Sequence, residues 1–269
     1  MSDRHRAPLE RTGMATPSIV VSGVTVSYAD KRGGRPACRD VSFTAERGEF
    51  IGIVGSSGCG KTTLLNAIAG FVKPSSGSVV VNGVQVTRPS AAVTMVFQSY
   101  ALFPWMTVEK NMMFGLRMKG LGADEAAPII DKYLEMADLQ GTQSLYPYQL
   151  SGGMQQRVAL ARALAIEPQI VLMDEPFAAV DLQTREDLQD ELGALTGVTR
   201  QTVLLVTHSV DEAVYLSDRV LVMGSRPGRV VGTFDVDLPR PRRREARSSP
   251  EFLAIRDAVS SELRVTATA

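Results

Sequence analysis

A glycine-rich stretch between an apolar run and a helical pattern constrains the fold most strongly. It reads Gly55-Ser56-Ser57-Gly58-Cys59-Gly60-Lys61-Thr62, which fits the pattern Gly-x-x-x-x-Gly-Lys-Ser/Thr. The apolar run Phe50–Val54 precedes it, and Thr62–Ala69 follows with a helical pattern. In this context the glycines let backbone N–H groups point at phosphate oxygens, and the helix N-terminus adds partial positive charge. The stretch therefore predicts a phosphate-binding loop rather than a structural glycine-rich turn, with Lys61 on the β- and γ-phosphates and Thr62 as a ligand of Mg²⁺.

Other apolar runs indicate the type of sheet around this loop. Ile170–Met173 and Thr202–Val206 lack polar alternation, which is typical of parallel strands that helices bury on both faces. The dipeptide Asn82-Gly83 lies between β-branched residues and tolerates the positive φ angles of a hairpin turn. Ile19–Tyr28 alternates as a half-buried strand does. We therefore expect an α/β protein with a parallel-sheet core and an antiparallel β subdomain near the N-terminus.

The chain divides into three expected regions. Residues 1–17 show little periodicity and predict a flexible N-terminal arm. Residues 18–235 form the expected main domain, with a helical subdomain inserted at about 99–160, where no further buried-strand pattern occurs. Residues 236–269 form a C-terminal tail, which contains the arginine-rich run 239–244. We expect this run to be solvated and flexible rather than a nucleic-acid site, because no aromatic residues are interleaved with its charges.

Composition excludes several classes of protein. Lys+Arg and Asp+Glu are equal at 29 each, so no net charge attracts the chain to nucleic acid or to anionic lipid. No stretch approaches the ~18–20 apolar residues of a membrane-spanning helix. The polar start, Met1–Arg6, is followed by no apolar run of signal-peptide length. Cys38 and Cys59 suggest no disulfide scaffold, so we expect a cytosolic protein that does not bind nucleic acid.

Acidic residues follow one of the predicted buried strands. Asp174 and Glu175 come directly after Ile170–Met173. A carboxylate there is costly unless it meets a partner such as a solvated metal ion, so Asp174 is expected to hold Mg²⁺ through water. Glu175 is expected to polarise the water that attacks the γ-phosphate. An Asp-Glu pair alone is commonplace, and it is the preceding phosphate loop that favours the functional interpretation over a structural one.

A second glycine element lies directly before another helical pattern. It reads Leu150-Ser151-Gly152-Gly153 and precedes Met154–Ala165. Its glycines would expose N–H groups at a helix N-terminus, which predicts a second anion site. Together with the upstream phosphate loop and the downstream Asp174-Glu175 pair, this element resembles the ATP-binding subunits of ABC transporters. The resemblance covers roughly residues 18–235 and implies a P-loop NTPase (RecA-like) fold and an ATPase that uses ATP and Mg²⁺.

The resemblance also assigns roles to individual residues. It implies that Tyr28 stacks on adenine, that Thr63 joins the loop residues in binding nucleotide, and that Gln98 reaches the metal and the attacking water. His208 matches the family's switch histidine, which would hydrogen-bond the γ-phosphate. By pattern alone, a histidine at a strand end is about as often structural as functional. The implied catalytic residues are thus Glu175, His208 and Gln98.

The same resemblance implies a head-to-tail dimer. Each ATP would lie between the phosphate loop of one subunit and Ser151, Gly152 and Gly153 of the other, with Asp181 contacting the partner. Val180 departs from the more usual Leu, and Met154 stands where many members have Gln. Neither change removes the anion-binding atoms. A homodimer is the simplest assembly, and a heterodimer with a related cassette stays an alternative.

Two functional classes are compatible with such a cassette. One is an importer ATPase that acts through separate membrane subunits, and the other is a soluble ABC ATPase of nucleic-acid repair or iron–sulfur assembly. A single cassette, two cysteines and no net positive charge favour transport. The segments 101–108, 146–149 and 224–229 resemble those of nitrate, sulfonate and taurine importer ATPases. We therefore expect uptake of such a small solute, with permease subunits as partners and a substrate-binding protein acting indirectly.

The expected location is the cytoplasmic face of the cell membrane, where the chain would be peripheral. We expect Gln98–Met113 to line the groove that receives the membrane subunits, because the aromatic cluster around Trp105, the only tryptophan, follows Gln98 directly. The alternative is that Trp105 packs inside the helical insert.

Overall fold

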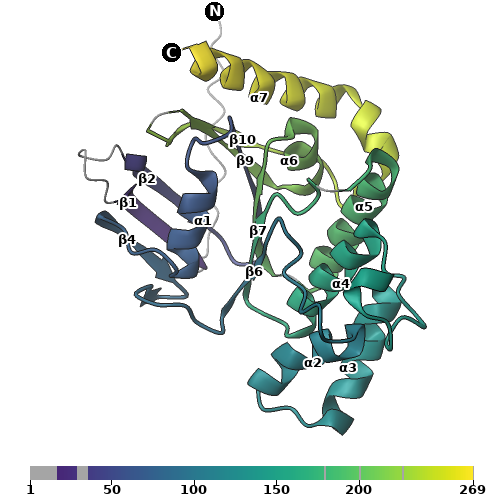
Figure 1. Ribbon diagram of the computed structural model, residues 1–269. Coiled ribbons are helices and arrows are strands. Elements are labelled where there is room, and N and C mark those ends of the chain that lie inside the picture. The colour runs from purple at the N-terminus through teal and green to yellow at the C-terminus, as the bar shows by residue number, and fades with distance from the viewer. Residues whose placement is uncertain (1–16, 29–35, 179, 200, 226, 269) are drawn as a thin grey trace, which may run out of the picture.

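A six-stranded sheet forms the centre of the computed structural model, which describes residues 17–28, 36–178, 180–199, 201–225 and 227–268. The strand order is β10-β9-β3-β8-β7-β6 (Figure 1). All neighbours are parallel except β10, which pairs antiparallel with β9. The strands are β3 (Phe50–Gly55), β6 (Val93–Val96), β7 (Ile170–Asp174), β8 (Thr202–Thr207), β9 (Arg219–Gly224) and β10 (Arg229–Asp235). Every residue of β3, β7 and β8 is buried, which explains their unbroken apolar sequences.

A smaller antiparallel sheet lies beside the central one. Its order is β2-β1-β4-β5, formed by β1 (Ile19–Ser27), β2 (Pro36–Ala45), β4 (Ser76–Val81) and β5 (Val84–Gln85). Asn82 and Gly83 have φ angles of 48° and 78°, so the hairpin predicted from this dipeptide is confirmed. The two sheets together confirm the predicted fold class.

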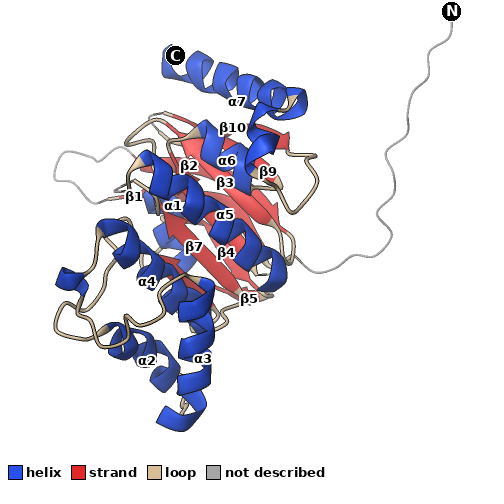
Figure 2. Ribbon diagram, turned by 90° about the vertical axis from the view of Figure 1, so that its right-hand side faces the viewer, coloured by secondary structure: helices blue, strands red, loops and turns tan. Residues whose placement is uncertain are grey.

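Helices cover the central sheet on both faces (Figure 2). Alternating strand residues divide the core in two: Ile51 and Leu172 pack with helix α1 (Lys61–Ala69), whereas Val54 and Met173 pack on the opposite face. The core on that opposite face contains side chains of α4 (Gly152–Ala165), α5 (Leu182–Thr199), α6 (Val210–Leu216) and the C-terminal helix α7 (Pro250–Thr268). The helices α2 (Val108–Met118) and α3 (Ala123–Met136) join this core by packing against α4. The phosphate loop and the Ser151 element therefore introduce helices on opposite faces of one sheet.

The segment between β6 and β7 is helical, as the sequence indicates. It contains α2, α3, the 3-10 turn η1 (Pro147–Gln149) and α4. Figure 1 shows α2 and α3 extending beyond the end of the sheet. The domain boundaries that we placed at residues 17/18 and 235/236 stay a prediction, and residues 1–16 lie outside the described part of the chain. Within the described ranges, no helix combines the length and the apolar composition needed to cross a bilayer.

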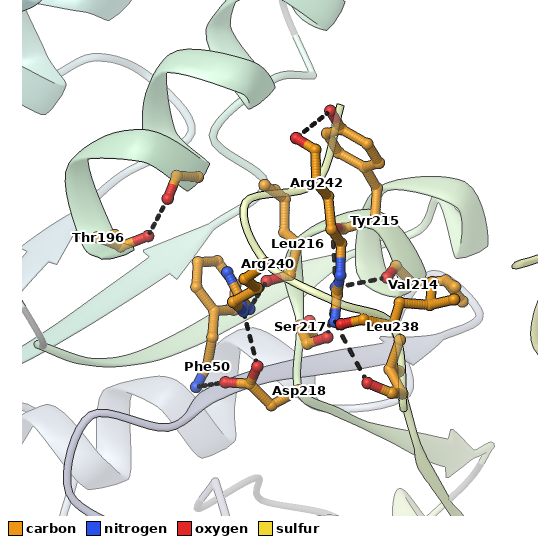
Figure 3. Close-up of polar contacts among 12 residues, drawn as sticks. Phe50, Thr196, Val214, Tyr215, Leu216, Ser217, Asp218, Leu238, Arg240 and Arg242 are labelled. Carbon is orange, nitrogen blue, oxygen red and sulfur yellow. Dashed lines mark hydrogen bonds and ion pairs between the residues drawn. The ribbon is translucent and has the colours of Figure 1, made fainter. Parts of the chain in front are cut away.

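The C-terminal region is folded rather than a flexible tail, although all residues of the arginine-rich run 239–244 except Arg242 are exposed, as expected. Residues 244–248 form the 3-10 turn η2 (Arg244–Ser248), and Pro250–Thr268 forms helix α7, which lies along β9 and β10 (Figure 1). Arg242 points inward and donates hydrogen bonds to five backbone carbonyls (Figure 3). The acceptors are the carbonyls of Val214, Tyr215, Ser217, Val236 and Leu238, at 2.7–3.4 Å. Burial lowers the pKa of Arg242 to about 10. Its guanidinium thus donates hydrogen bonds to carbonyls at the end of α6, where a helix has no N–H groups of its own to pair with them.

Replacing Arg242 by Ala is expected to destabilise the protein by about 2–4 kcal/mol, because the carbonyls at the end of α6 lose a charged donor. Urea unfolding followed by circular dichroism measures this loss. Arg243→Ala is the matched control, since Arg243 is exposed and its removal should cost at most about 0.5 kcal/mol. If the two variants unfold at the same urea concentration, Arg242 contributes no more to stability than the exposed Arg243 does.

Candidate nucleotide-binding and catalytic site

The predicted site residues gather at one edge of the central sheet. The phosphate loop follows β3, Gln98 follows β6, the Asp174-Glu175 pair ends β7, and His208 follows β8. These strands are parallel, so their carboxyl ends meet at the same edge. Ligands of open α/β sheets bind at this edge.

Backbone geometry explains the glycines of the phosphate loop. Gly58 and Gly60 have φ angles of 76° and 96°, which residues with a Cβ adopt only with strain. A Cβ on Gly60 would also meet the backbone of Ala37. Cys59 turns its thiol into the core, and burial raises the pKa of that thiol, so Cys59 would serve a nucleotide through its backbone.

Lys61 holds its ammonium group inside the loop. Its Nζ donates to the carbonyls of Gly55 at 2.8 Å and Ser56 at 3.1 Å, and the residue is 5% exposed. A buried cation among inward-facing backbone groups is suited to a phosphate, which supplies charge and acceptors together.

Thr62 and Asp174 lie together beside this cation. The Thr62 hydroxyl donates to Asp174 Oδ1 at 3.1 Å, and Asp174 is 8% exposed. Burial raises the pKa of Asp174, and the neighbouring Glu175 raises it further. A desolvated carboxylate beside a hydroxyl is a set of oxygen donors that fits Mg²⁺, which takes one or two carboxylate contacts alongside substrate phosphates.

Glu175 and His208 form a pair at the mouth of the site. His208 Nδ1 lies 3.4 Å from Glu175 Oε2. Glu175 has a φ angle of 47°, a conformation that is uncommon for a residue with a side chain. The hydrogen bond from Glu175 N to the carbonyl of Val206, at 2.8 Å, ties this turn to β8. The structure therefore brings together two of the three residues for which the resemblance implies catalytic roles, as a carboxylate beside an imidazole.

Tyr28 and Gln98 flank this centre. The Tyr28 hydroxyl lies 3.3 Å from Thr63 Oγ1, and the residue is 52% exposed, so its ring has a free face beside α1. Gln98 is exposed and lies two residues beyond β6, whose Val96 pairs with Met173. The structure places Gln98 at this edge, and within the described residues no hydrogen bond joins its side chain to Asp174 or Glu175.

The Ser151 element does not join this cluster. Ser151 caps α4, since its hydroxyl accepts a hydrogen bond from Met154 N at 3.3 Å. Ser151 and Gly152 are exposed at the N-terminus of α4. Because α1 and α4 cover opposite faces of the sheet, one chain cannot bring its phosphate loop and its Ser151 element to the same phosphate.

Asp181 lies close to this second element. Asp181 Oδ1 accepts a hydrogen bond from Thr184 N at 3.1 Å, and this bond lowers the pKa of Asp181. A Cβ on Gly153 would lie 2.7 Å from Thr184 Cγ2, so the Asp181 turn packs against the first turn of α4. The departures Val180 and Met154 both pack against the core, which explains their apolar character.

Sequence reasoning missed Glu212 and its partner Thr207. Glu212 is 6% exposed, and it accepts a 2.5 Å hydrogen bond from the Thr207 hydroxyl, directly before His208. A glutamate on a helical pattern gives no signal of burial, and only its spacing of four residues from His208 could have suggested a connection.

The comparisons with known proteins agree with this geometry. Residues 38–178 match the family described as ABC transporter. The nitrate import ATP-binding protein of Synechocystis sp. is 43% identical over 243 residues, which cover 88% of this chain and 91% of that protein. The aliphatic sulfonates import ATP-binding protein of Bacillus licheniformis is 44% identical over 230 residues, covering 86% and 88%. The taurine import ATP-binding protein of Jannaschia sp. is 42% identical over 251 residues, covering 90% and 92%.

A solved structure is also similar. It is a dimeric ATP-binding cassette in a post-hydrolysis state, bound to ADP and Pi. Its TM-score is 0.73 at 31% identity, over 82% of this chain and all of that chain.

Proposed function

This chain belongs to the ABC transporter family, as an ATPase coupled to transport, and from that premise we propose that it powers the uptake of a small solute through separate membrane subunits. The observation that carries the proposal is the division of the anion-binding elements. Lys61 and its loop open α1 on one face of the sheet, and Ser151 opens α4 on the other. Both elements can hold one γ-phosphate only if two chains meet head to tail. The dimeric state of the similar cassette bound to ADP and Pi supports this arrangement.

The chemistry follows from the positions of the side chains. Lys61 would neutralise the β- and γ-phosphates, and Thr62 and Asp174 would hold Mg²⁺. Bound there, the ion supplies positive charge that offsets the charge developing on the phosphate oxygens. Glu175 would take the proton of the attacking water as the new O–P bond forms and the bond to the leaving ADP oxygen breaks. His208, 3.4 Å from Glu175, would orient the γ-phosphate and the water.

We propose that the solute belongs to the class of nitrate, taurine, aliphatic sulfonates or a related small molecule. Three relatives with 42–44% identity carry the import of these solutes in their names. The membrane subunits and a substrate-binding protein would choose the solute, since the ATPase does not touch it. The alternative, a soluble ABC ATPase in repair or iron–sulfur assembly, gains no support from these relatives.

The proposed partners place the chain at the cytoplasmic face of the membrane. The surface we assign to the permease is the loop and helix after Gln98. Trp105 is 70% exposed and Phe114 45% exposed, and both lie close to the ring of Phe103. Aromatic residues of this kind are enriched where proteins meet partners.

A mixture of two inactive variants tests the head-to-tail site. Lys61→Ala removes the phosphate-loop cation, and Ser151→Phe blocks the second element, so each variant alone should hydrolyse almost no ATP. A mixed dimer restores one complete site, from Lys61 of one chain and Ser151 of the other. Random exchange should therefore recover about a quarter of the wild-type turnover, since half of the dimers are mixed and each has one good site.

The matched control mixes Lys61→Ala with Lys61→Ala/Ser151→Phe, in which no complete site can form. Phosphate release measures both mixtures. If the first mixture stays as inactive as the second, the ATP site is not shared between chains in this way.

A further inference from the structure

A buried carboxylate lies between the His208 turn and the Asp181 turn. Glu212 is on the first turn of α6 and is 6% exposed. Its Oε2 accepts a hydrogen bond from Thr207, and its Oε1 lies 3.9 Å from Arg185 Nε on α5. The cost of burying a carboxylate is offset only where such partners exist.

On one side, Glu212 is part of a closed set of bonds around His208. The Thr207 hydroxyl donates to Glu212 at 2.5 Å and accepts from Ser209 N at 3.0 Å. The Ser209 hydroxyl accepts from Glu212 N at 3.3 Å, as the cap of α6. The residues on both sides of His208 are therefore fixed, which limits where the exposed imidazole can lie.

On the other side, Arg185 reaches the turn that carries Asp181. Its Nη2 donates to the carbonyl of Val180 at 2.9 Å, and its backbone N donates to the carbonyl of Asp181 at 2.9 Å. Val180 is 4% exposed, so this turn is anchored in the core as well as joined to Arg185 by these two hydrogen bonds.

We propose that Glu212 is a positioning residue that fixes the position of His208 relative to the Asp181 turn. The inference rests on the proposed function, in which Asp181 meets the partner subunit and His208 meets the γ-phosphate. Through Arg185 and Thr207, Glu212 links the interface to the hydrolytic centre, so a shift of Asp181 on dimerisation is transmitted to His208. Glu212 itself touches neither nucleotide nor metal.

The first test uses conservative variants of the full-length chain. Thr207→Val removes the hydroxyl with little change of volume, Thr207→Ser keeps it, and Glu212→Gln removes the charge that faces Arg185. For Thr207→Val and Glu212→Gln, we expect kcat to fall about ten- to hundredfold, because a small misplacement of an orienting group is costly. The Kd for Mg-ATP should stay within about twofold, since the phosphate loop is untouched. Thr207→Ser should restore turnover, and Asp211→Asn, at an exposed neighbour, should match the wild type.

A spectroscopic readout separates positioning from general loss of structure. The chain has two histidines, so a histidine-selective NMR spectrum contains ring signals from His208 and His5 only. In Thr207→Val and Glu212→Gln the His208 signal should shift and that of His5 should not. Wild-type turnover in Thr207→Val, or a fall in turnover with an unmoved His208 signal, would overturn the proposal.

The link to the Asp181 turn is tested by a double variant. Arg185→Leu should lower kcat as Glu212→Gln does, and the double variant should lose no more than either single one. Losses that multiply would show that the two residues act separately. His208→Ala distinguishes a failure of the proposed function from a failure of this inference: if His208→Ala retains full turnover, the role of His208 is wrong whatever the Glu212 variants do.

Discussion

Glu175→Gln is expected to abolish ATP turnover while ATP still binds. The substitution keeps the shape of the side chain but removes the base that accepts the proton of the attacking water. Loss of a general base lowers the rate by about 10²–10⁴-fold. Binding should persist because Lys61, Thr62 and Asp174 keep their contacts, which do not depend on Glu175. Phosphate release measures turnover, and a fluorescent ATP analogue measures the Kd.

The same variant should accumulate a dimer, since ATP that is bound but not hydrolysed holds two chains together. Light scattering of Glu175→Gln with Mg-free ATP should show a mass of twice the chain, and without nucleotide the mass should fall. Glu251→Gln, at an exposed position on α7, is the matched control and should behave like the wild type. Near-normal hydrolysis by Glu175→Gln would remove Glu175 from the role of base, and a mass that stays at one chain at high concentration would argue against the shared site.

The features predicted from sequence are those that local physics determines. The unbroken apolar runs before Lys61, Asp174 and His208 predict strands buried on both faces, and the structure has them as parallel neighbours. Once parallel strands are adjacent, the residues at their carboxyl ends must meet, which is why Glu175 and His208 form a pair despite their separation in sequence. The positive φ angle of Gly60 likewise follows from the phosphate-loop pattern.

The features missed from sequence depend on partners far along the chain. The run around Arg242 has the composition of a solvated tail, but its carbonyl acceptors include residues 25–28 positions earlier, at the end of α6. In the sequence, Glu212 has the features of an exposed helix residue. Its burial results from its contacts with Arg185 and Thr207, which only the folded chain brings together. Strand β2 was not predicted because its buried and exposed residues do not alternate regularly. In each case, tertiary contacts outweigh local pattern.

The aromatic surface after Gln98 is held in place by a buried asparagine. Asn111 is fully buried, donates to the carbonyls of Phe103, Met106 and Thr107, and accepts from Phe103 N at 2.8 Å. Arg162 donates to the carbonyl of Tyr100 at 3.2 Å, and its guanidinium lies over the ring of Phe103. The loop that carries Trp105 is therefore anchored from beneath, while Trp105 itself is 70% exposed. The alternative that Trp105 packs inside the helical insert is wrong.

Trp105→Ala is expected to abolish solute uptake without harming the isolated subunit. An exposed tryptophan on an anchored loop buries a large area when a partner covers it, and truncating such a residue costs about 2 kcal/mol or more of binding free energy. Assembly with the permease should therefore weaken by about thirtyfold. ATP binding by the isolated chain should stay within about twofold, because Trp105 contributes nothing to the Lys61 loop. Folding should also be preserved, since the anchoring contacts of Asn111 and Arg162 stay in place.

The measurements are co-purification with the permease, ATP affinity, and uptake by reconstituted vesicles. Val265→Ala is the matched control, because Val265 is 62% exposed on α7, which lies at the opposite end of the molecule from α2 (Figure 1). It should assemble and transport as the wild type does. If Trp105→Ala unfolds, the residue supports the insert rather than a partner, and if it assembles and transports normally, the permease binds elsewhere. Because the loop begins directly after Gln98, loss of uptake with retained ATP binding would place the coupling between hydrolysis and transport at this surface.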